Sequence, residues 1–261
     1  MKRYIGGLNN MKSTTMTEFS GGGASNKTVL QGFTLAEVLI TLGVIGIVAA
    51  MTLPALITRN QNKALEASLK KNYAVIQHAL DMYQAEHGER LTRKILTSRA
   101  GGVTLYTEIK PYFKIIHDCG QTGSQAKGCI PYYGNPGNDE RNSKTYMTFN
   151  KTPLTRLSLF DDGQFILNDG SLIMIENPNE TSDLYISVDV NGYRKNPNRW
   201  GHDLFTFQLM DDGRLLPMGA PYTRFAVKSS TCSVSSVNEF NGVGCTYYAL
   251  TEKDYFNNLP R

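Results

Sequence analysis

An apolar run with a single charge near its start constrains this chain more than any other feature. The run begins at Gly32 and reaches Ile57, and Glu37 is the only ionisable residue in it before Arg59. A helix of about 20 apolar residues is long enough to cross the hydrocarbon core of a bilayer. A charged side chain inside that core costs several kcal/mol, so Glu37 is expected to have a functional partner.

The start of the run reads Gly32-Phe33-Thr34-Leu35-Ala36-Glu37-Val38-Leu39-Ile40. This motif, followed by an apolar helix, resembles the prepilin signal shared by type IV pilins and type II secretion pseudopilins. The resemblance implies that a membrane prepilin peptidase cuts between Gly32 and Phe33 on the cytoplasmic side and then N-methylates Phe33. It covers residues 27–88 closely and is loose beyond them.

Glu37 occupies the position where this family keeps a glutamate. Burial in hydrocarbon disfavours an ionised carboxyl group unless a cation lies nearby. Cleavage before Phe33 creates such a cation, an amine that stays charged when it is methylated. In a stack of subunits, Glu37 of one chain could meet the amine of the next and fix the axial step. The alternative is a carboxylate at a helix N-terminus, favoured by the helix macrodipole and by interfacial water.

Residues 1–32 are expected to form a cytoplasmic leader that is removed, because the segment is polar and has no helical or strand period. Met11 or Met16 is an alternative start of the chain. A secretory signal peptide is the main competing interpretation. It would need a shorter apolar core and a small-x-small cleavage site, for which only Ala49-Ala50 offers a weak match.

Beyond the apolar run the chain becomes amphipathic, and Gly88 predicts a helix C-cap. The apolar face of this part carries Leu65, Leu69, Tyr73, Ile76, Leu80 and Tyr83. We therefore predict one helix over residues 33–87, of which 33–57 spans the membrane or forms a filament core and 58–88 is its amphipathic continuation. Pro54 removes a backbone hydrogen bond and permits a kink. The family resemblance implies a role for this proline in assembly, where the helix bends or unwinds.

Residues 89–261 predict a β-rich extracytoplasmic head. Short runs rich in β-branched and aromatic residues are expected strands: Tyr146–Asn150, Arg156–Phe160, Gln164–Leu167, Leu172–Glu176, Leu184–Val190, Phe205–Met210 and Arg214–Leu216. Asp-Gly and Asn-Gly pairs predict tight hairpin turns at Asp161-Asp162-Gly163, Asn168-Asp169-Gly170, Asn191-Gly192 and Asp211-Asp212-Gly213. A short helix is expected over Thr104–Phe113. The predicted fold class is α+β, a long helix packed through residues 65–83 on an antiparallel sheet, in the lollipop arrangement of pilins.

The four cysteines form two local pairs, Cys119 with Cys129 and Cys232 with Cys245. Neither pair has the C-x-x-C spacing of a zinc or thioredoxin-type site. Polar, glycine-rich segments favour two short-range disulfides, and hence an oxidising compartment outside the cytoplasmic membrane. Four cysteines allow three connectivities, and four unpaired thiols are the alternative. We interpret Cys119–Asn142 as an ordered loop pinned by its disulfide, and the region of the second pair as a disulfide-closed flap.

The formal net charge of +4 makes the whole chain mildly basic. The expected leader carries a net charge of +3, from Lys2, Arg3, Lys12 and Lys27 against Glu18. The mature chain would therefore carry 4 − 3 = +1. Because a nucleic-acid binder needs a basic face, nucleic acid is not an expected partner.

No catalytic residues are expected, and the protein is not expected to be an enzyme. The histidines are scattered through the chain, at His78, His87, His117 and His202. The sequence contains no H-E-x-x-H, no paired metal-ligand spacing, no G-x-S-x-G and no phosphate-binding glycine loop.

One segment carries a candidate metal site. Asp189, Asn191 and Asp203 offer the hard oxygen ligands that calcium prefers. The spacing differs from an EF-hand, because Trp200 stands where the bidentate glutamate should be. The segment resembles loops of pseudopilin-like proteins, some of which bind calcium. The favoured alternative is an Asn-Gly hairpin followed by an Asx-capped turn. Apart from this calcium ion, no cofactor is expected.

The resemblance implies a structural subunit of a type IV pilus or of a type II secretion pseudopilus. Its implied partners are prepilin peptidase, other pilin or pseudopilin subunits, an inner-membrane assembly platform and membrane lipid. The protein would cross the bacterial cytoplasmic membrane once, with a periplasmic or extracellular head, and would enter a filament after assembly. Two alternatives remain open: a minor or tip subunit whose head binds DNA, a secreted substrate or a surface, and an anchored domain that never assembles.

Overall fold

The computed structural model of the chain describes residues 32–98, 104–121, 128–130, 146–154, 159, 162–176 and 183–260. The helices are α1 (Leu35–His87), α2 (Arg93–Ser98), α3 (Leu105–Ile109), α4 (Lys228–Thr231) and α5 (Cys245–Thr251), with 3₁₀ turns η1 (Lys110–Tyr112) and η2 (Tyr255–Asn258). The strands are β1 (Ile115–Gly120), β2 (Gly163–Leu167), β3 (Leu172–Glu176), β4 (Leu184–Asp189), β5 (Leu204–Leu209) and β6 (Leu215–Pro217). The expected leader, apart from its last residue Gly32, lies outside the described residues.

Helix α1 is 53 residues long and contains Pro54 without interruption. Its end at His87 agrees with the prediction. Gly88 has a φ of +76°, and its N–H bonds to the carbonyl of Gln84 at 2.8 Å. A left-handed residue that closes the last turn is the usual role of glycine after a helix, so the predicted C-cap is confirmed. The chain forms two compact units, and the boundary between them lies within α1, between Ala50 and Met51.

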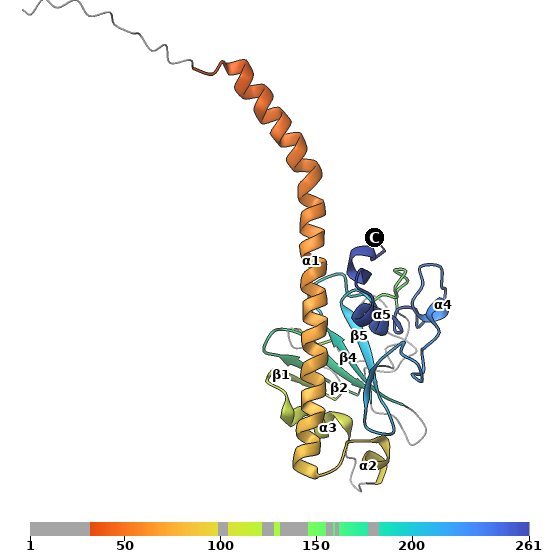
Figure 1. The fold of residues 1–261 in the computed structure, drawn as a ribbon. Coiled ribbons are helices and arrows are strands. Elements are labelled where there is room, and N and C mark those ends of the chain that lie inside the picture. The colour runs from red at the N-terminus through yellow and green to blue at the C-terminus, as the bar shows by residue number, and fades with distance from the viewer. Residues whose placement is uncertain are drawn as a thin grey trace, which may run out of the picture. The chain divides into compact units, whose positions relative to one another are not determined.

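The six strands form one antiparallel sheet in the order β1-β2-β3-β4-β5-β6. Every strand therefore pairs with its neighbour in sequence, which is the order of a meander. Figure 1 shows the C-terminal part of α1 crossing this sheet. The predicted α+β class, a long N-terminal helix with an antiparallel sheet, is confirmed.

Successive side chains along each strand point to opposite faces of the sheet, and both faces are buried. The face toward α1 carries Phe165, Leu167, Ile173, Ile175, Ile186, Val188, Phe205 and Phe207, which join Leu69, Ile76, Ala79, Leu80 and Tyr83 of the helix in one core cluster. The other face carries Ile166, Leu172, Met174, Tyr185 and Leu204, which pack in a second cluster with Tyr146, Trp200, Met218 and Val243. The predicted packing of residues 65–83 on the sheet is confirmed, and the sheet is covered on its far side as well.

Polar contacts fix α1 against the turn between β2 and β3. The side chains of Asn72 and Ser171 are both fully buried, and the hydroxyl of Ser171 donates to Oδ1 of Asn72 at 3.0 Å. Nearby, Nζ of Lys71 lies 2.6 Å from a carboxylate oxygen of Asp169. Gly170 completes this turn with a φ of +87°, as the Asn-Asp-Gly sequence predicts.

Two disulfides join Cys119 to Cys129 and Cys232 to Cys245. These are the local pairs expected from the sequence. The C-terminal region is more than a peripheral flap, because Cys232, Cys245 and Phe256 belong to the core cluster beneath α1. Cys119 lies in strand β1. The interpretation of Cys119–Asn142 as a loop is therefore wrong at the start of that range.

The strand predicted at Tyr146–Asn150 is wrong. Met147 makes only isolated bridges, and the chain reverses within a few residues, with Lys151 at a φ of +69°. The prediction failed because the aromatic residues here pack into the core from a turn, Tyr146 into the second cluster and Phe149 into the first. The strand expected at Arg156–Phe160 lies outside the described residues except for Leu159, which is a buried turn residue. The first residue of the turn at Asp161 also lies outside them.

The tight hairpin predicted at Asn191-Gly192 is also wrong. Strand β4 ends at Asp189 and β5 begins at Leu204, so a long loop, Val190–Asp203, connects them. Gly192 has a φ of +85°, but its turn serves the loop and does not join two strands directly. The turn at Asp211-Asp212-Gly213 is confirmed, with Gly213 donating to the carbonyl of Met210 at 2.8 Å between β5 and β6.

Candidate functional site

The first turn of α1 is closed by a reciprocal pair of hydrogen bonds between Thr34 and Glu37. The backbone N–H of Glu37 donates to the Thr34 hydroxyl at 3.2 Å, and the backbone N–H of Thr34 donates to Oε2 of Glu37 at 2.8 Å. The Thr34 hydroxyl also donates to Oε2 at 2.8 Å. This arrangement is a capping box, in which a threonine and a glutamate three residues later satisfy each other's backbone donors.

Gly32 and Phe33 precede the helix and have no regular secondary structure. The side chain of Phe33 is 88% exposed, and nothing lies within 4 Å of a Cβ built on Gly32. The bond between Gly32 and Phe33 is therefore an accessible, non-helical peptide bond directly before a well-capped helix. A peptidase needs this kind of extended, reachable backbone.

The apolar residues after Glu37 are exposed along the helix. Leu39, Ile40, Leu42, Val44, Ile45, Ile47 and Met51 each expose more than half of their surface. An 18-residue window of α1 has a mean hydropathy of 2.3 and is 0% buried, which makes α1 long and apolar enough to cross a membrane. A bare apolar surface of this length requires lipid or other protein to cover it.

Pro54 lies within the continuous helix, where it contributes no backbone N–H. The hydroxyl of Thr58 donates to the carbonyl of Pro54 at 2.9 Å, one turn later. Further along, Nδ2 of Asn62 donates to the carbonyl of Phe256 at 2.6 Å and ties the helix to the C-terminal segment. This contact between the amphipathic part and the C-terminal segment lies two turns after the proline.

Comparison with known protein families decides what the N-terminal geometry represents. Residues 31–53 match the family model described as the prokaryotic N-terminal methylation motif. This is the type IV prepilin and pseudopilin signature. The match includes Gly32, Phe33 and Glu37, together with the first half of the apolar helix. No curated protein and no solved structure matches the chain.

The prepilin signature implies processing by a peptidase and assembly with other pilin-type subunits in general. It also agrees with membrane anchoring through the apolar helix. The role it suggests is that of a structural subunit. The capping box adds a detail of this chain, namely that Glu37 already binds the backbone of its own first turn.

The structure brings Asp189 and Asp203, two of the expected calcium ligands, into one buried loop. Both side chains are fully buried. Oδ1 of Asp189 accepts from Gly192 N–H at 2.8 Å, and Oδ2 accepts from the Tyr146 hydroxyl at 2.8 Å. The Asp203 carboxylate accepts from the N–H groups of Asn198 at 2.8 Å and Arg199 at 2.7 Å.

The electrostatics of this loop favour neutralisation of the two carboxylates. Burial, and then the charge of Asp203, raise the pKa of Asp189 well above its ordinary value. Burial raises the pKa of Asp203 to about 6, against hydrogen bonds that lower it. The guanidinium of Arg199 is directed elsewhere, because its Nη1 donates to the carbonyl of Pro260 at 3.1 Å.

Two further oxygens of this loop lack a hydrogen-bond donor. Among the residues the structure describes, Oδ1 of Asn191 and Oδ1 of Asn198 are buried and have no hydrogen-bond partner. A buried acceptor without a donor is unusual and costs stability unless something else satisfies it. Carboxylate and amide oxygens are the ligands that calcium uses, so the residues present fit this ion.

Sequence reasoning missed three residues of these sites. Thr34 could have been found, because Thr-x-x-Glu before an apolar run is the pattern of a capping box. Asn198 could have been included as one more hard ligand in the same loop. Tyr146 had no local signal, since its bond to Asp189 joins segments far apart in the sequence.

Proposed function

We propose that this protein is a structural subunit of a type IV pilus or a type II secretion pseudopilus. Prepilin peptidase cuts between Gly32 and Phe33 and methylates Phe33, and the subunits then assemble through α1. The observation that carries this proposal is the exposed apolar helix that follows the prepilin signature, with Glu37 as its single charge.

The surface of the helix supports assembly through close helix contacts. Gly43 and Gly46 lie on an open surface, because nothing lies within 4 Å of a Cβ built on either residue. Small residues allow the backbones of neighbouring helices to approach closely in lipid. Glu37 gives the contact a register, since its carboxylate is stabilised where it meets the amine of a neighbouring Phe33.

Under this proposal, the protein crosses the bacterial cytoplasmic membrane once. Residues 1–32 form the removed leader, 33–57 the membrane and filament-core helix, 58–88 its amphipathic continuation, and 89–261 the head. The two disulfides support a head in an oxidising compartment, periplasmic or extracellular. An inner-membrane assembly platform, membrane lipid and other subunits are the partners.

Mass spectrometry of the protein purified from its own cells tests this function. The expected result is a chain of 261 − 32 = 229 residues that begins with N-methylated Phe33. A chain that retains residues 1–32, or one that has lost the apolar segment as a secreted protein does, would contradict the proposal. A subunit that is processed but never found in filaments would be an anchored domain.

As a second proposal, the loop Val190–Asp203 holds a calcium ion that stabilises the head. The carboxylates of Asp189 and Asp203 and the Oδ1 atoms of Asn191 and Asn198 would hold the ion. The ion would supply the positive charge that two buried carboxylates need. The buried, unpartnered amide oxygens are the observation that favours it over a purely hydrogen-bonded turn.

A further inference from the structure

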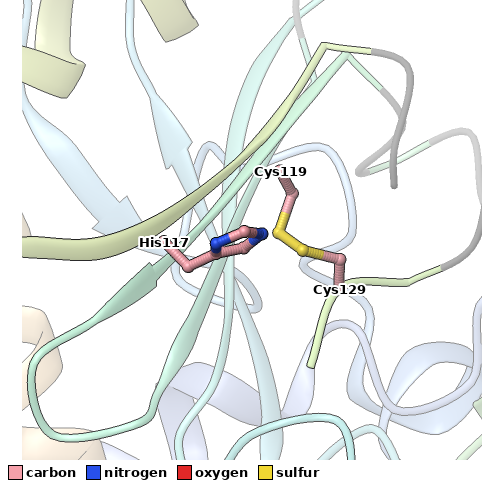
Figure 2. A group of neighbouring side chains, drawn as sticks. All are labelled: His117, Cys119 and Cys129. Carbon is pink, nitrogen blue, oxygen red and sulfur yellow. A yellow bond between two sulfur atoms is a disulfide. The ribbon is translucent and has the colours of Figure 1, made fainter. Parts of the chain in front are cut away.

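His117 lies beside the disulfide between Cys119 and Cys129. A nitrogen of its imidazole ring and the two sulfurs all lie within 4.8 Å of one another. Figure 2 shows the ring of His117 directed at the sulfur of Cys119. The backbone explains the arrangement, because His117 and Cys119 are two residues apart on β1 and Cys129 faces them from the segment before Ile130.

We propose that the reduced form of this protein binds a thiophilic divalent cation, with zinc as the representative ion, through Cys119, Cys129 and His117. Two thiolates and one imidazole are the ligand types that zinc prefers. In the oxidised chain each sulfur is bonded to the other, so the site exists only when the disulfide is open.

The two cysteines remain together without their covalent bond. Cys119 is held in β1 by pairing with β2, in which Gly120 lies opposite Gln164. Cys129 is held by its neighbour Ile130, whose buried N–H donates to Oε1 of Gln164 at 3.0 Å. The Cα atoms of the cysteines are 5.8 Å apart. One side chain of β2 thus lies next to both cysteine segments.

The distances suit a zinc ion after a small movement. Bond lengths of about 2.3 Å to sulfur and about 2.0 Å to nitrogen place tetrahedral ligands roughly 3.5–4 Å apart. The imidazole nitrogen and both sulfurs already lie within 4.8 Å of one another. Once the disulfide opens, rotation of the cysteine side chains moves the two sulfurs apart to the spacing that zinc needs. The exposed edge at His117 leaves the fourth coordination position to water.

The surroundings also favour a negatively charged pair of sulfurs. Gln164 is fully buried, and its Nε2 has no hydrogen-bond partner among the described residues. This donor lies next to both cysteine segments, where it can bond to a thiolate. Asp118 does not oppose the site, because its carboxylate accepts from Nζ of Lys110 at 2.8 Å and from the Tyr106 hydroxyl.

The redox step is a thiol–disulfide exchange. A dithiol reductant breaks the sulfur–sulfur bond and becomes a disulfide itself, while two electrons and two protons pass to Cys119 and Cys129. Zinc then displaces the two thiol protons, which go to solvent, and binds the thiolates together with the neutral imidazole of His117. Within the described part of the chain, no comparable cluster includes Cys232 and Cys245.

The test uses the full chain in detergent micelles, either oxidised or reduced with a dithiol and then desalted without oxygen. We expect the reduced chain to bind one Zn²⁺ and the oxidised chain none. His117→Gln should weaken zinc binding by about tenfold or more, since it removes a ligand. The matched control is His78→Gln, an exposed histidine on α1 that should leave zinc affinity unchanged.

Two further measurements distinguish zinc bound at the proposed site from zinc bound to any reduced thiol. Cobalt in place of zinc should give a thiolate charge-transfer band that is lost in Cys119→Ser. The fluorescence of Trp200, the single tryptophan, should remain that of a buried side chain in the reduced protein. No zinc binding, equal affinity in His117→Gln, a band that persists in Cys119→Ser, or an unfolded Trp200 spectrum would each overturn the proposal.

Discussion

Thr34 donates two hydrogen bonds to one carboxylate oxygen of Glu37. The backbone N–H and the hydroxyl of Thr34 both reach Oε2 at 2.8 Å. Within the described residues, Oε1 of Glu37 accepts no hydrogen bond. The acid is therefore bound at the start of its own helix while one of its oxygens remains available. A neighbour's terminal amine can bind that oxygen without disrupting the cap.

Replacing Thr34 by valine should loosen the first turn of α1. Valine keeps the shape of the side chain but removes the hydroxyl, and loss of an N-cap costs about 0.5–2 kcal/mol. We expect amide protons of the first turn to exchange roughly 2- to 30-fold faster in micelles, measured by NMR. Thr34→Ser keeps the hydroxyl and is the control. Equal exchange in Thr34→Val and the unaltered chain would show that the capping box does not close this turn.

Asn72→Ala should destabilise the head. The substitution removes a buried amide and one acceptor of the Ser171 hydroxyl, which keeps Oδ1 of Asp169 at 2.6 Å. The expected cost is therefore that of one lost hydrogen bond, about 0.5–1.5 kcal/mol. Urea denaturation followed by fluorescence measures this cost. Gln61→Ala, at an exposed position of the same helix, is the control and should change the midpoint little. A midpoint equally unchanged in Asn72→Ala would mean that the contact is not a stabilising link.

The ion pair of Asp169 with Lys71 should make stability depend on pH on the acid side. Burial raises the pKa of Asp169, but hydrogen bonds from Lys71 and Ser171 outweigh it, and the pKa lies below its ordinary value of 3.8. A lowered folded-state pKa gives stability that is present above the unfolded value and lost as pH falls through the folded one.

Melting curves of Asp169→Asn and the unaltered chain measure this effect. The difference in Tm should be largest near about pH 6–7 and should shrink below about pH 4. Asp81→Asn, at an exposed position of α1, is the control. A difference between Asp169→Asn and the unaltered chain that stays constant down to acid pH would exclude the ion pair as its source.

Calcium should raise the melting temperature of the head. At about 100 times the dissociation constant, a bound ion adds about 2.7 kcal/mol, or roughly 5–10 °C for a domain of this size. Asp203→Asn should abolish the shift, whereas Asp211→Asn, in the exposed turn before β6, should retain it. An unchanged melting temperature in excess calcium would leave the loop as a hydrogen-bonded turn alone.

The sequence predicted the elements that have a strong apolar pattern. Helix α1 carries apolar residues at helical spacing, and strands β2 to β6 are short apolar-rich runs bounded by turn residues, because both faces of the sheet are buried. Strand β1 was missed because it lacks such a pattern. Its residues from Ile116 to Asp118 are exposed at the sheet edge, so no alternation marks them.

Tertiary contacts decided the features that local patterns could not. Tyr146 and Trp200 fill the second core cluster from loops, which no period of the sequence indicates. The turn at Asn191-Gly192 was wrongly predicted to be a hairpin. It belongs to a longer loop that is organised by two buried carboxylates, Asp189 and Asp203, one at each end of that loop. The prepilin signature was readable because it lies in one continuous segment, residues 31–53.

Incorporation of Glu37→Gln into filaments tests the central claim most directly. Glutamine keeps the capping box but removes the charge that a terminal amine needs. In cells that also express the native subunit, we expect the variant to be processed at Phe33 and to be at least about tenfold less abundant than the native subunit in sheared filaments. Glu89→Gln, beyond the end of α1, should be incorporated normally. Equal incorporation of Glu37→Gln and the native subunit would contradict the pairing and the account built on it.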